Sequence, residues 1–295
     1  MTLPDDATLA VGMSVFNAEL TVAGAIRSVQ AQTHADWRLL VLDDGSTDAT
    51  AAVVQALADD DDRIELIHGA SHRGLPQRLN ELLDLATEKF FARMDADDIC
   101  HPDRFARQLA FMLRNPDVDL VGSSMLILDR AGQVRGIRPA PTAHDEICAR
   151  PWSGFPLFHP TWLGHRLWFR RFGYAAYATR CEDQELLLRA HQGSRFANLP
   201  EPLVGYREDR LIWHHIQTGR ATYAQRAMIE SWRSGHRLRP VTIAVEHVGK
   251  SLVEAVAITT HTERTLLQHR SRPLAPGDAA EWEHAQVCGP PVVRA

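Results

Sequence analysis

Short apolar runs alternate with amphipathic segments through the first part of the chain. The apolar runs predict strands at residues 9–16, 37–42, 64–68 and 90–94, with a fifth strand beginning at 119–122. The segments between them have apolar side chains at helical spacing and predict helices at residues 19–32, 48–58, 74–87 and 102–114. The second strand is nearly all apolar, which is typical of a strand covered on both faces. This order predicts an α/β fold with a doubly wound, mostly parallel, Rossmann-like sheet.

The pattern beyond residue 122 is less regular. Residues 123–137 predict strands around a turn at Ala131-Gly132, and residues 150–180 predict loops with short helices. Further helices are predicted at residues 181–192, 216–234 and 246–257, with a strand just before the last of them. Proline and glycine predict a loose tail after Ser271. The pattern therefore divides the chain into parts at residues 1–122, 123–212, 213–270 and 271–295.

Composition places the chain among ordinary soluble proteins, since 45% of its 295 residues are hydrophobic and 23% are charged. No run approaches the ~18 apolar residues that a membrane helix needs. The acidic N-terminus lacks the basic region of a signal peptide. The four cysteines contain no CxxC pair, which argues against a disulfide framework and a zinc ribbon. A reducing cytoplasm is the simplest location.

The net charge of −5 is unevenly distributed along the chain. Residues 1–122 hold 21 acidic and 10 basic side chains, whereas the remainder holds 16 acidic and 22 basic ones. This distribution argues against a uniformly basic nucleic-acid binder. The acidic first part suits a metal ion, and the basic second part suits an anionic acceptor or a membrane surface.

Acidic and polar side chains follow three of the predicted strands directly. Asn17 follows the first, Asp43 and Asp44 follow the second, and Asp95, Asp97 and Asp98 follow the fourth. Because ligands of such sheets bind beyond the carboxyl ends of the strands, we expect these side chains to converge on one edge.

The two acidic groups have different candidate chemistry. One of Asp43 and Asp44 could accept a hydrogen bond from a nucleobase, although helix capping explains Ser46, Thr47 and Asp48 equally well. The cluster of Asp95, Asp97 and Asp98 suits Mg²⁺ or Mn²⁺ with substrate phosphates, and the alternative is an acidic surface turn.

Residues of the second half could supply a base and an acceptor site. Glu182 and Asp183 open a helix, where the macrodipole favours acids, or one of them serves as a general base. His159, Thr161 and Trp162, with the basic and aromatic stretch 165–174, could line a sugar or lipid-sugar site. The same residues could instead form a packed subdomain.

Six motifs together resemble the pattern of glycosyltransferase family 2, whose members are inverting, metal-dependent enzymes of the GT-A fold. The resemblance covers about residues 9–210 and rests on MSVFNAE, VLDDGSTDAT, GLPQRLN, FFARMDADDICHPDRFARQLAFM, DVDLVGS and CEDQELLLR, in this order. No QxxRW motif follows Asp183, which argues against a processive polysaccharide synthase.

The resemblance implies a role for each matching position. Residues 1–122 become a nucleotide-sugar-binding half, 123–212 an acceptor-binding and catalytic half, and 213–270 a helical extension before the tail. It implies Asp183 as the catalytic base with Glu182 beside it, and a metal on Asp95, Asp97 and Asp98. The positions matching donor contacts are Ser14, Val15, Phe16, Asn17, Glu19, Asp43, Asp44, Asp95 and Ala96. His159, Thr161 and Trp162 match an acceptor-side motif.

Some positions depart from the family pattern. Phe16 stands where Tyr is common and keeps a ring that can stack on a base. His72 stands where Asn is usual, and Leu79 where Arg is frequent, so Arg73 or Arg78 is expected to contact the phosphates instead. His214 and His215 are further candidates for a diphosphate contact.

The expected activity is inverting transfer of a sugar from a nucleotide donor, with UDP-sugars favoured, to a hydroxyl of a sugar or lipid-linked sugar acceptor. The family resemblance further implies a place in bacterial surface polysaccharide or glycolipid assembly. A nucleotidyltransferase and a non-catalytic sugar-nucleotide-binding module are the alternatives. A patch of Trp162, Trp168, Phe169, Arg170, Arg171 and Phe172 suits peripheral contact with the inner face of the membrane.

Overall fold

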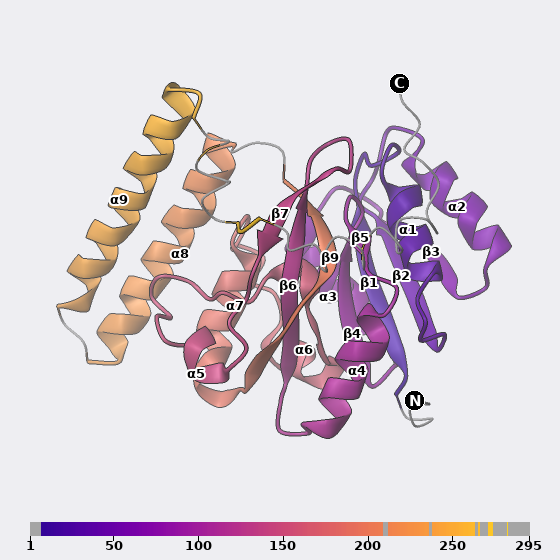
Figure 1. Cartoon of the computed structure of the whole chain (residues 1–295), viewed down its shortest axis with the longest axis horizontal. Coiled ribbons are helices and arrows are strands. Elements are labelled where there is room, and N and C mark those ends of the chain that lie inside the picture. Colours follow the sequence, from indigo (N-terminus) through magenta and orange to yellow (C-terminus); the bar gives the residue numbers. More distant parts are fainter. Residues whose placement is uncertain are drawn as a thin grey trace.

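The computed structural model describes residues 7–208, 212–235, 238–262, 265, 271–273 and 282. Strands and helices alternate through its first half (Figure 1). The strands here are β1 (Leu9–Val15), β2 (Trp37–Asp43), β3 (Ile64–His68), β4 (Phe90–Asp95) and the short β5 (Ile99–Cys100). The helices are α1 (Val22–Gln30), α2 (Thr50–Asp60), α3 (Leu75–Leu85) and α4 (Arg104–Arg114).

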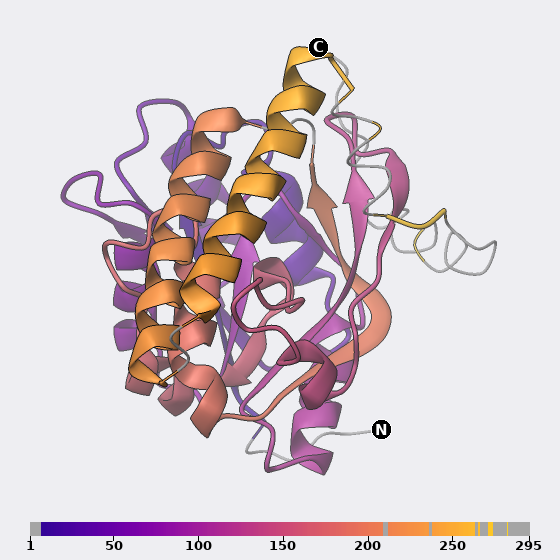
Figure 2. The same ribbon diagram turned by 90° about the vertical axis from the view of Figure 1, so that its left-hand side faces the viewer.

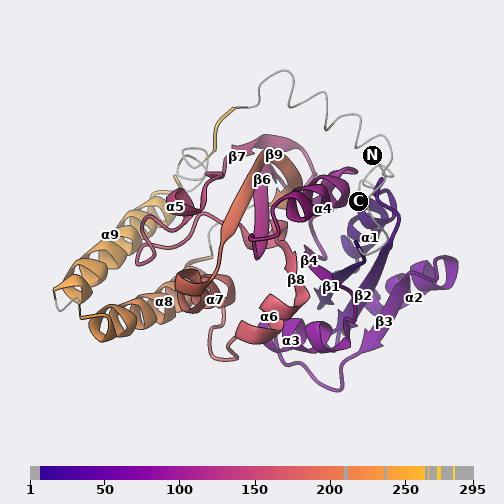
Figure 3. The same ribbon diagram turned by 90° about the horizontal axis from the view of Figure 1, so that it is seen from below.

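Alternate side chains of the central strands enter two different apolar cores. Leu39 and Val41 of β2 pack in the core that contains α1 and α4. Leu40 and Leu42 pack in the core that contains α3 and α6 (Arg166–Phe172). Figure 3 shows these two pairs of helices on opposite sides of the sheet. Coverage of both faces explains why β2 is apolar at nearly every position and confirms the doubly wound α/β fold.

The sheet becomes mixed beyond β4. Strands β3, β2, β1 and β4 are parallel neighbours in that order. The next neighbour is β8 (Leu163–His165), a short antiparallel strand that separates β4 from β6 (Leu120–Leu128). β6 pairs in parallel with β9 (Phe196–Arg207) and antiparallel with β7 (Val134–Arg138), and β5 pairs with β9. The predicted fifth strand is therefore present as β6, but it does not neighbour β4.

Strands β8 and β9 were absent from the prediction. β9 contains Pro200 and Pro202, and its pairing with β6 shifts register between Ser123 and Met125. These prolines and the irregular register remove the alternation that identifies a strand from sequence. β6 and β7, in contrast, are the predicted strands around the turn at Ala131-Gly132.

The remaining helices lie in the second half of the chain. They are α5 (His144–Ile147), α7 (Glu182–Ala190), α8 (Trp213–Arg233) and α9 (Arg239–Thr259), with short 3-10 turns η1 (His159–Thr161) and η2 (His191–Gly193). α8 and α9 lie side by side on one flank of the molecule (Figures 1 and 2). The strand predicted before residue 246 is wrong, because its residues belong to α9. Its β-branched residues favour a strand locally, and packing against the body overrides that preference.

Part of the predicted tail is packed against the sheet. The Trp282 side chain is 2% exposed, packs with Leu126, Leu128 and Ile137, and donates a hydrogen bond from Nε1 to the Pro202 carbonyl at 2.9 Å. The prediction of a loose tail is therefore wrong at Trp282. Most of residues 271–295 lie outside the described part of the chain.

The aromatic patch expected at a membrane surface is mostly core. Trp162 and Phe169 are 0% exposed and Trp168 is 5% exposed, whereas Arg170 and Arg171 are exposed. The rings pack together under α3 and α7, so this stretch is a packed subdomain and the predicted patch is wrong for these three rings. Among the described residues, no helix is long and apolar enough to cross a membrane.

Candidate active site

Hydrogen bonds connect the turns after β1 and β2 at the carboxyl edge of the sheet. Asn17 donates its backbone N–H to Ser46 Oγ (3.0 Å), and its side-chain Oδ1 accepts the Thr47 N–H (2.9 Å). The Glu19 carboxylate accepts the Ala49 N–H at 2.8 Å, where α2 begins. Asn17 and Glu19 therefore join the two turns, and their contact with a nucleotide stays a prediction.

Asp44 is a buried anchor for the loop that follows β3. Its carboxylate accepts the backbone N–H groups of Arg73 and Gly74, each at 2.8 Å, and the Nε–H of Arg78. Burial raises the pKa of Asp44, but these hydrogen bonds outweigh it and leave the pKa below its ordinary value. Asp44 and Arg78 are each 2% exposed, so the expected contacts of both with a donor are not available in this structure.

An exposed aromatic pair lies beside this loop. The Phe16 ring is 46% exposed and its centroid is 4.3 Å from that of His72. His72 Nδ1 is 3.0 Å from an oxygen of Asp44, which fixes the imidazole in place. An exposed, held ring suits stacking on a nucleobase. The neighbouring Asp43 accepts the Ser46 N–H at 3.0 Å, so the base-contacting role of Asp43 stays a prediction.

Ser14, Val15, Ala96 and Arg73 surround these turns. Ser14 is half-buried, and Val15 is buried with its carbonyl accepting the Asp44 N–H at 2.8 Å. Ala96 is 9% exposed within the acidic turn after β4. The Arg73 guanidinium is largely exposed and ion-paired with Glu81, so of the two predicted phosphate contacts only Arg73 is accessible.

Three carboxylates gather at the end of β4. Oxygen atoms of Asp95, Asp97 and Asp98 lie within 4.8 Å of one another. Asp98 is fully buried, and its Oδ1 accepts the Arg207 N–H at 3.1 Å, while Oδ2 has no hydrogen-bond partner among the described residues. Burial and repulsion from Asp95 and Asp97 raise the pKa of Asp98 well above its ordinary value. A buried carboxylate oxygen without a partner, in an all-oxygen donor set, fits Mg²⁺ or Mn²⁺.

Arg93 is a site residue that the sequence reading missed. It is 4% exposed in the middle of β4 and ion-paired with Asp95, and its Nε and Nη1 have no partner among the described residues. The sequence does contain a signal for it, because Arg93 interrupts an otherwise apolar buried strand.

Arg207 is a second residue that the sequence did not indicate. Its Nε–H donates a hydrogen bond to the Asp97 carbonyl at 2.6 Å and so stabilises the acidic turn.

A cavity of about 260 Å³ brings the two distant acidic groups together. Asp95 and Arg93 line it from β4, and Glu182 and Asp183 line it from the first turn of α7. Its other lining residues are Met125, Arg138, Leu157, Phe158, His159, Pro160, Gln184, Tyr206 and Glu208. A carboxylate of the candidate metal site thus shares one cavity with both candidate bases.

The acids on α7 repel each other. Burial and the charge of Asp183 raise the pKa of Glu182. Burial also raises the pKa of Asp183, although Gln184 donates a hydrogen bond to it at 3.1 Å. Carboxyl groups with raised pKa values in a cavity are candidates for proton transfer.

His159 lies next to Glu182 in the lining of the cavity. Its Nε2 is 3.0 Å from the Tyr174 hydroxyl and its Nδ1 is 3.9 Å from a Glu182 oxygen. Burial and the nearby Arg93 charge hold the pKa of His159 well below its usual range, so the imidazole is neutral.

Two expected acceptor contacts are structural residues. Thr161 and Trp162 are 0% exposed; Thr161 Oγ1 accepts the Ser123 N–H at 3.0 Å, and Trp162 Nε1 donates to the Leu157 carbonyl at 3.2 Å. Their burial corrects the prediction that they touch the acceptor. His215 lies on α8, 3.1 Å from Arg180, and neither it nor His214 lines the cavity.

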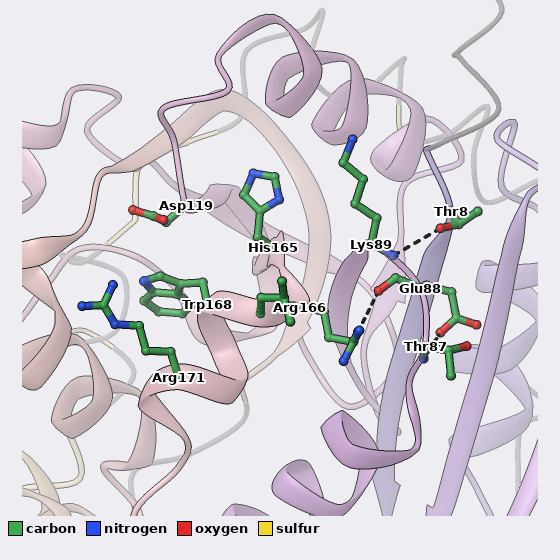
Figure 4. A pocket seen from close by; sticks show the side chains of 10 residues that line it. Thr8, Thr87, Glu88, Lys89, Asp119, His165, Arg166, Trp168 and Arg171 are labelled. Carbon is green, nitrogen blue, oxygen red and sulfur yellow. Dashed lines mark hydrogen bonds between the residues drawn. The ribbon is translucent and has the colours of Figure 1, made fainter.

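A larger cavity of about 720 Å³ lies at the opposite edge of the sheet (Figure 4). Thr8, Lys89 and Asp119 line it, and they immediately precede β1, β4 and β6. Ligands of doubly wound sheets bind at the carboxyl ends of the strands, so this cavity is not the candidate active site.

Fold and site together define a class of protein. A doubly wound sheet with an acidic turn after β4, facing a carboxylate pair on a later helix, is the GT-A arrangement of glycosyltransferases. The family model "Glycosyl transferase family 2" matches residues 10–173, more than half of the chain, and the chain belongs to this family.

Relatives and solved structures agree with this assignment. The chain is 36% identical over 207 residues to the glycosyltransferase EpsE of Bacillus subtilis, covering 68% of this chain and 73% of EpsE. It is 32% identical over 143 residues to WfgD of Escherichia coli, covering 48% of this chain and 56% of WfgD. WfgD is a UDP-Glc:alpha-D-GlcNAc-diphosphoundecaprenol beta-1,3-glucosyltransferase. S. aureus TarS 1–349 in complex with UDP-GlcNAc superposes with a TM-score of 0.66 at 14% identity, over 96% of this chain and 82% of that TarS fragment. The chain is thus a glycosyltransferase of the GT-A fold.

Proposed function

We propose that this enzyme transfers a sugar, with inversion, from a UDP-sugar to a hydroxyl group of a lipid-linked sugar during bacterial polysaccharide assembly. One observation carries the proposal, namely the cavity that Asp95 shares with Glu182 and Asp183. It gives the donor diphosphate and the acceptor hydroxyl a common meeting point. The donor and acceptor classes follow from WfgD, whose substrates are a UDP-sugar and a diphosphoundecaprenol-linked sugar.

The residues of the cavity support a single in-line displacement. Asp183 accepts the proton of the acceptor hydroxyl, and that oxygen bonds to the anomeric carbon of the donor sugar. The bond from this carbon to the nucleoside diphosphate breaks on the opposite face, so the anomeric configuration inverts. Glu182 lies beside Asp183 in the same cavity, and burial raises the pKa of Asp183 and with it the proton affinity of the base.

Asp95, Asp97 and Asp98 would hold a divalent cation, and Arg93 fixes Asp95 for this role through their ion pair. When bound, Mn²⁺ or Mg²⁺ stabilises negative charge on the leaving diphosphate. Phe16 and His72 offer a stacking surface for the base at the same edge of the sheet.

Separate measurements of binding and turnover test the proposal. Thermal shifts are recorded with UDP, GDP, dTDP, CDP and ATP, each with Mn²⁺ or with EDTA. Transfer is then assayed from UDP-sugars to a polyprenyl-diphosphate-linked sugar, and product configuration is read by NMR. We expect a UDP shift that needs the metal, and an inverted product. A retained configuration would contradict the displacement, and nucleotide binding without transfer to any acceptor or water would favour a non-catalytic module.

A further inference from the structure

The outer face of α9 is apolar, although this helix lies at the edge of the molecule. Figure 2 shows α9 beside α8, with both helices in front of the rest of the molecule. Seven large apolar side chains on and just before α9 are 57–83% exposed: Leu238, Val241, Val245, Val248, Leu252, Val253 and Val256. Between Val241 and Val256, a stretch that the structure describes completely, the charged residues are Glu246, Lys250 and Glu254, and only the Lys250 side chain is more than a third exposed, at 41%.

Three of the four Lys, Arg, Asp and Glu residues of α9 bond to neighbouring parts of the chain, and Arg239 at its start is exposed. Glu246 accepts a hydrogen bond from Ser153 at 2.5 Å, and Lys250 donates to the Ser153 carbonyl at 3.1 Å. Glu254 is ion-paired with Arg220 of α8 at 2.7 Å. A helix on the surface of a monomer normally has the reverse arrangement, with its polar side outward. The outer face of α9 therefore has the composition of a buried surface.

We propose that this face binds the same face of a second copy of the chain, forming a two-fold dimer with the two α9 helices antiparallel. A two-fold interface must be self-complementary, since each residue meets its symmetry counterpart. Four of the seven exposed side chains satisfy this condition about the point between Val248 and Gly249. Val241 and Val256 lie equally far from that point along the helix, and so do Val245 and Leu252.

Gly249 provides room at the centre of this pairing. A Cβ placed on it would meet no atom within 4 Å, so the position is open to solvent. In the antiparallel arrangement, Val248 of one copy enters the gap beside Gly249 of the other. The spacing of three and four residues from Leu238 through Leu252 suits interdigitation of two helices.

The size of the face fits a dimer. Burying a Val or Leu removes on the order of 100 Å² of apolar surface, so seven side chains more than half exposed present roughly 400–500 Å². This is a suitable apolar centre for an interface of about 800 Å² per partner.

Charge favours a second copy over a lipid surface. A helix that lies on an anionic bilayer is rich in Lys and Arg. α9 has only Arg239 and Lys250, and Lys250 is ion-paired with Glu246. Two copies of an uncharged face meet without like-charge repulsion.

The test measures the mass of the full-length protein by sedimentation velocity from about 1 to 100 µM, the range of affinities typical of moderate interfaces. We expect a dimer for the wild type. Val248→Glu places two carboxylates together on the symmetry axis, and we expect it to weaken dimerisation by at least about 100-fold. Leu167→Glu is the matched control, because Leu167 is 69% exposed on α6 and should leave the dimer intact.

Cysteine cross-linking tests the orientation, in a background with Cys148→Ser and Cys288→Ser. An equimolar mixture of Val241→Cys and Val256→Cys proteins should form the mixed disulfide, and neither protein should cross-link to itself. A monomeric wild type, a dimer that survives Val248→Glu, or cross-linking of Val241→Cys to itself overturns the proposal. Pelleting of a monomeric wild type with phosphatidylglycerol vesicles, lost in Val248→Glu, assigns the face to lipid instead.

Discussion

At the scale of single residues, the site depends on charges that are buried close to one another. Asp98 has an oxygen without a hydrogen-bond partner among the residues that the structure describes, Arg93 is ion-paired with Asp95, and the charge of Asp183 repels that of Glu182. Burying each of these groups would lower the stability of a protein that had no ligand or reaction for them. Substituting any one of these buried groups should therefore change activity or stability measurably.

Asp183→Asn should lower kcat by roughly 10²–10⁴-fold, the usual contribution of a general base. Binding of UDP should persist, because Asp183 lies on α7 and not among the turns at the ends of β1 and β2. Single-turnover kinetics and a thermal shift with UDP measure the two effects separately. Asp145→Asn on α5 is the control, since Asp145 does not line the cavity. Near-wild-type turnover in Asp183→Asn would show that Asp183 is not the general base.

Transfer should be lost as the pH falls, at a higher pH than an ordinary carboxyl group would give. The base must be ionised to accept a proton. Burial raises the pKa values of both Glu182 and Asp183, and the charge of Asp183 raises that of Glu182 further. Glu182→Gln removes the repulsion, so its acid limb should move to lower pH. The measurement is kcat/KM from pH 5 to 9 for both proteins; an unmoved or upward-shifted limb would show that the two acids are not coupled.

Arg93→Leu should lower transfer more strongly than Arg93→Lys. Leucine removes the buried cation that pairs with Asp95, and lysine keeps the charge but loses the guanidinium geometry. The informative readout is the apparent affinity for Mn²⁺ in the assay, which should weaken by roughly 10–100-fold in Arg93→Leu. An unchanged metal affinity would limit Arg93 to a structural role.

At the scale of elements, buried ion pairs fix the loops that border the site. Asp44, at the end of β2, accepts hydrogen bonds from the backbone of the loop after β3 and forms an ion pair with Arg78 of α3. One buried carboxylate thus joins two strands and a helix, so the loop that carries His72 depends on it.

Asp44→Ala should destabilise the fold by about 3 kcal/mol, because the buried Arg78 then keeps only its ion pair with the more exposed Glu81. The double variant with Arg78→Met should recover part of this loss, since the poorly compensated charge is then removed. Urea unfolding of the two single variants and the double variant gives the coupling free energy. Additive losses would mean that the pair is not the main stabilising contact of this loop.

At the scale of the whole molecule, metal binding and stability are linked through the acidic cluster. Because the pKa of Asp98 is raised in the folded state, the native protein binds more protons than the unfolded one between the two pKa values. Without metal, stability should therefore fall as pH rises through the folded-state pKa. A bound cation replaces the proton and opposes this loss.

Mn²⁺ at about 100 times its Kd should raise Tm by roughly 5–10 °C over the EDTA sample. The difference should grow from pH 5 to pH 8. Asp98→Asn keeps an oxygen for the Arg207 N–H, and it should abolish the metal-dependent shift without lowering the Tm of the metal-free protein. Differential scanning calorimetry measures both; a metal shift that persists in Asp98→Asn would place the cation elsewhere.

The sequence by itself determined the parallel core and the acidic edge. Apolar runs such as Trp37–Asp43 indicate a strand that is buried on both faces of the sheet. Residues that directly follow parallel strands must lie at the same edge of the sheet. Both conclusions depend on local periodicity, which a single sequence carries in full. The family motifs rest on the same local segments.

Only the tertiary structure decided what depends on distant neighbours. It inserted β8 between β4 and β6, placed Glu182 and Asp183 in one cavity with Asp95, and buried Thr161 and Trp162. It also turned the apolar face of α9 outward. A sequence shows that a side chain is charged or apolar, but the partner that satisfies it is set by long-range packing, which for Asp95 and Asp183 joins segments nearly 90 residues apart.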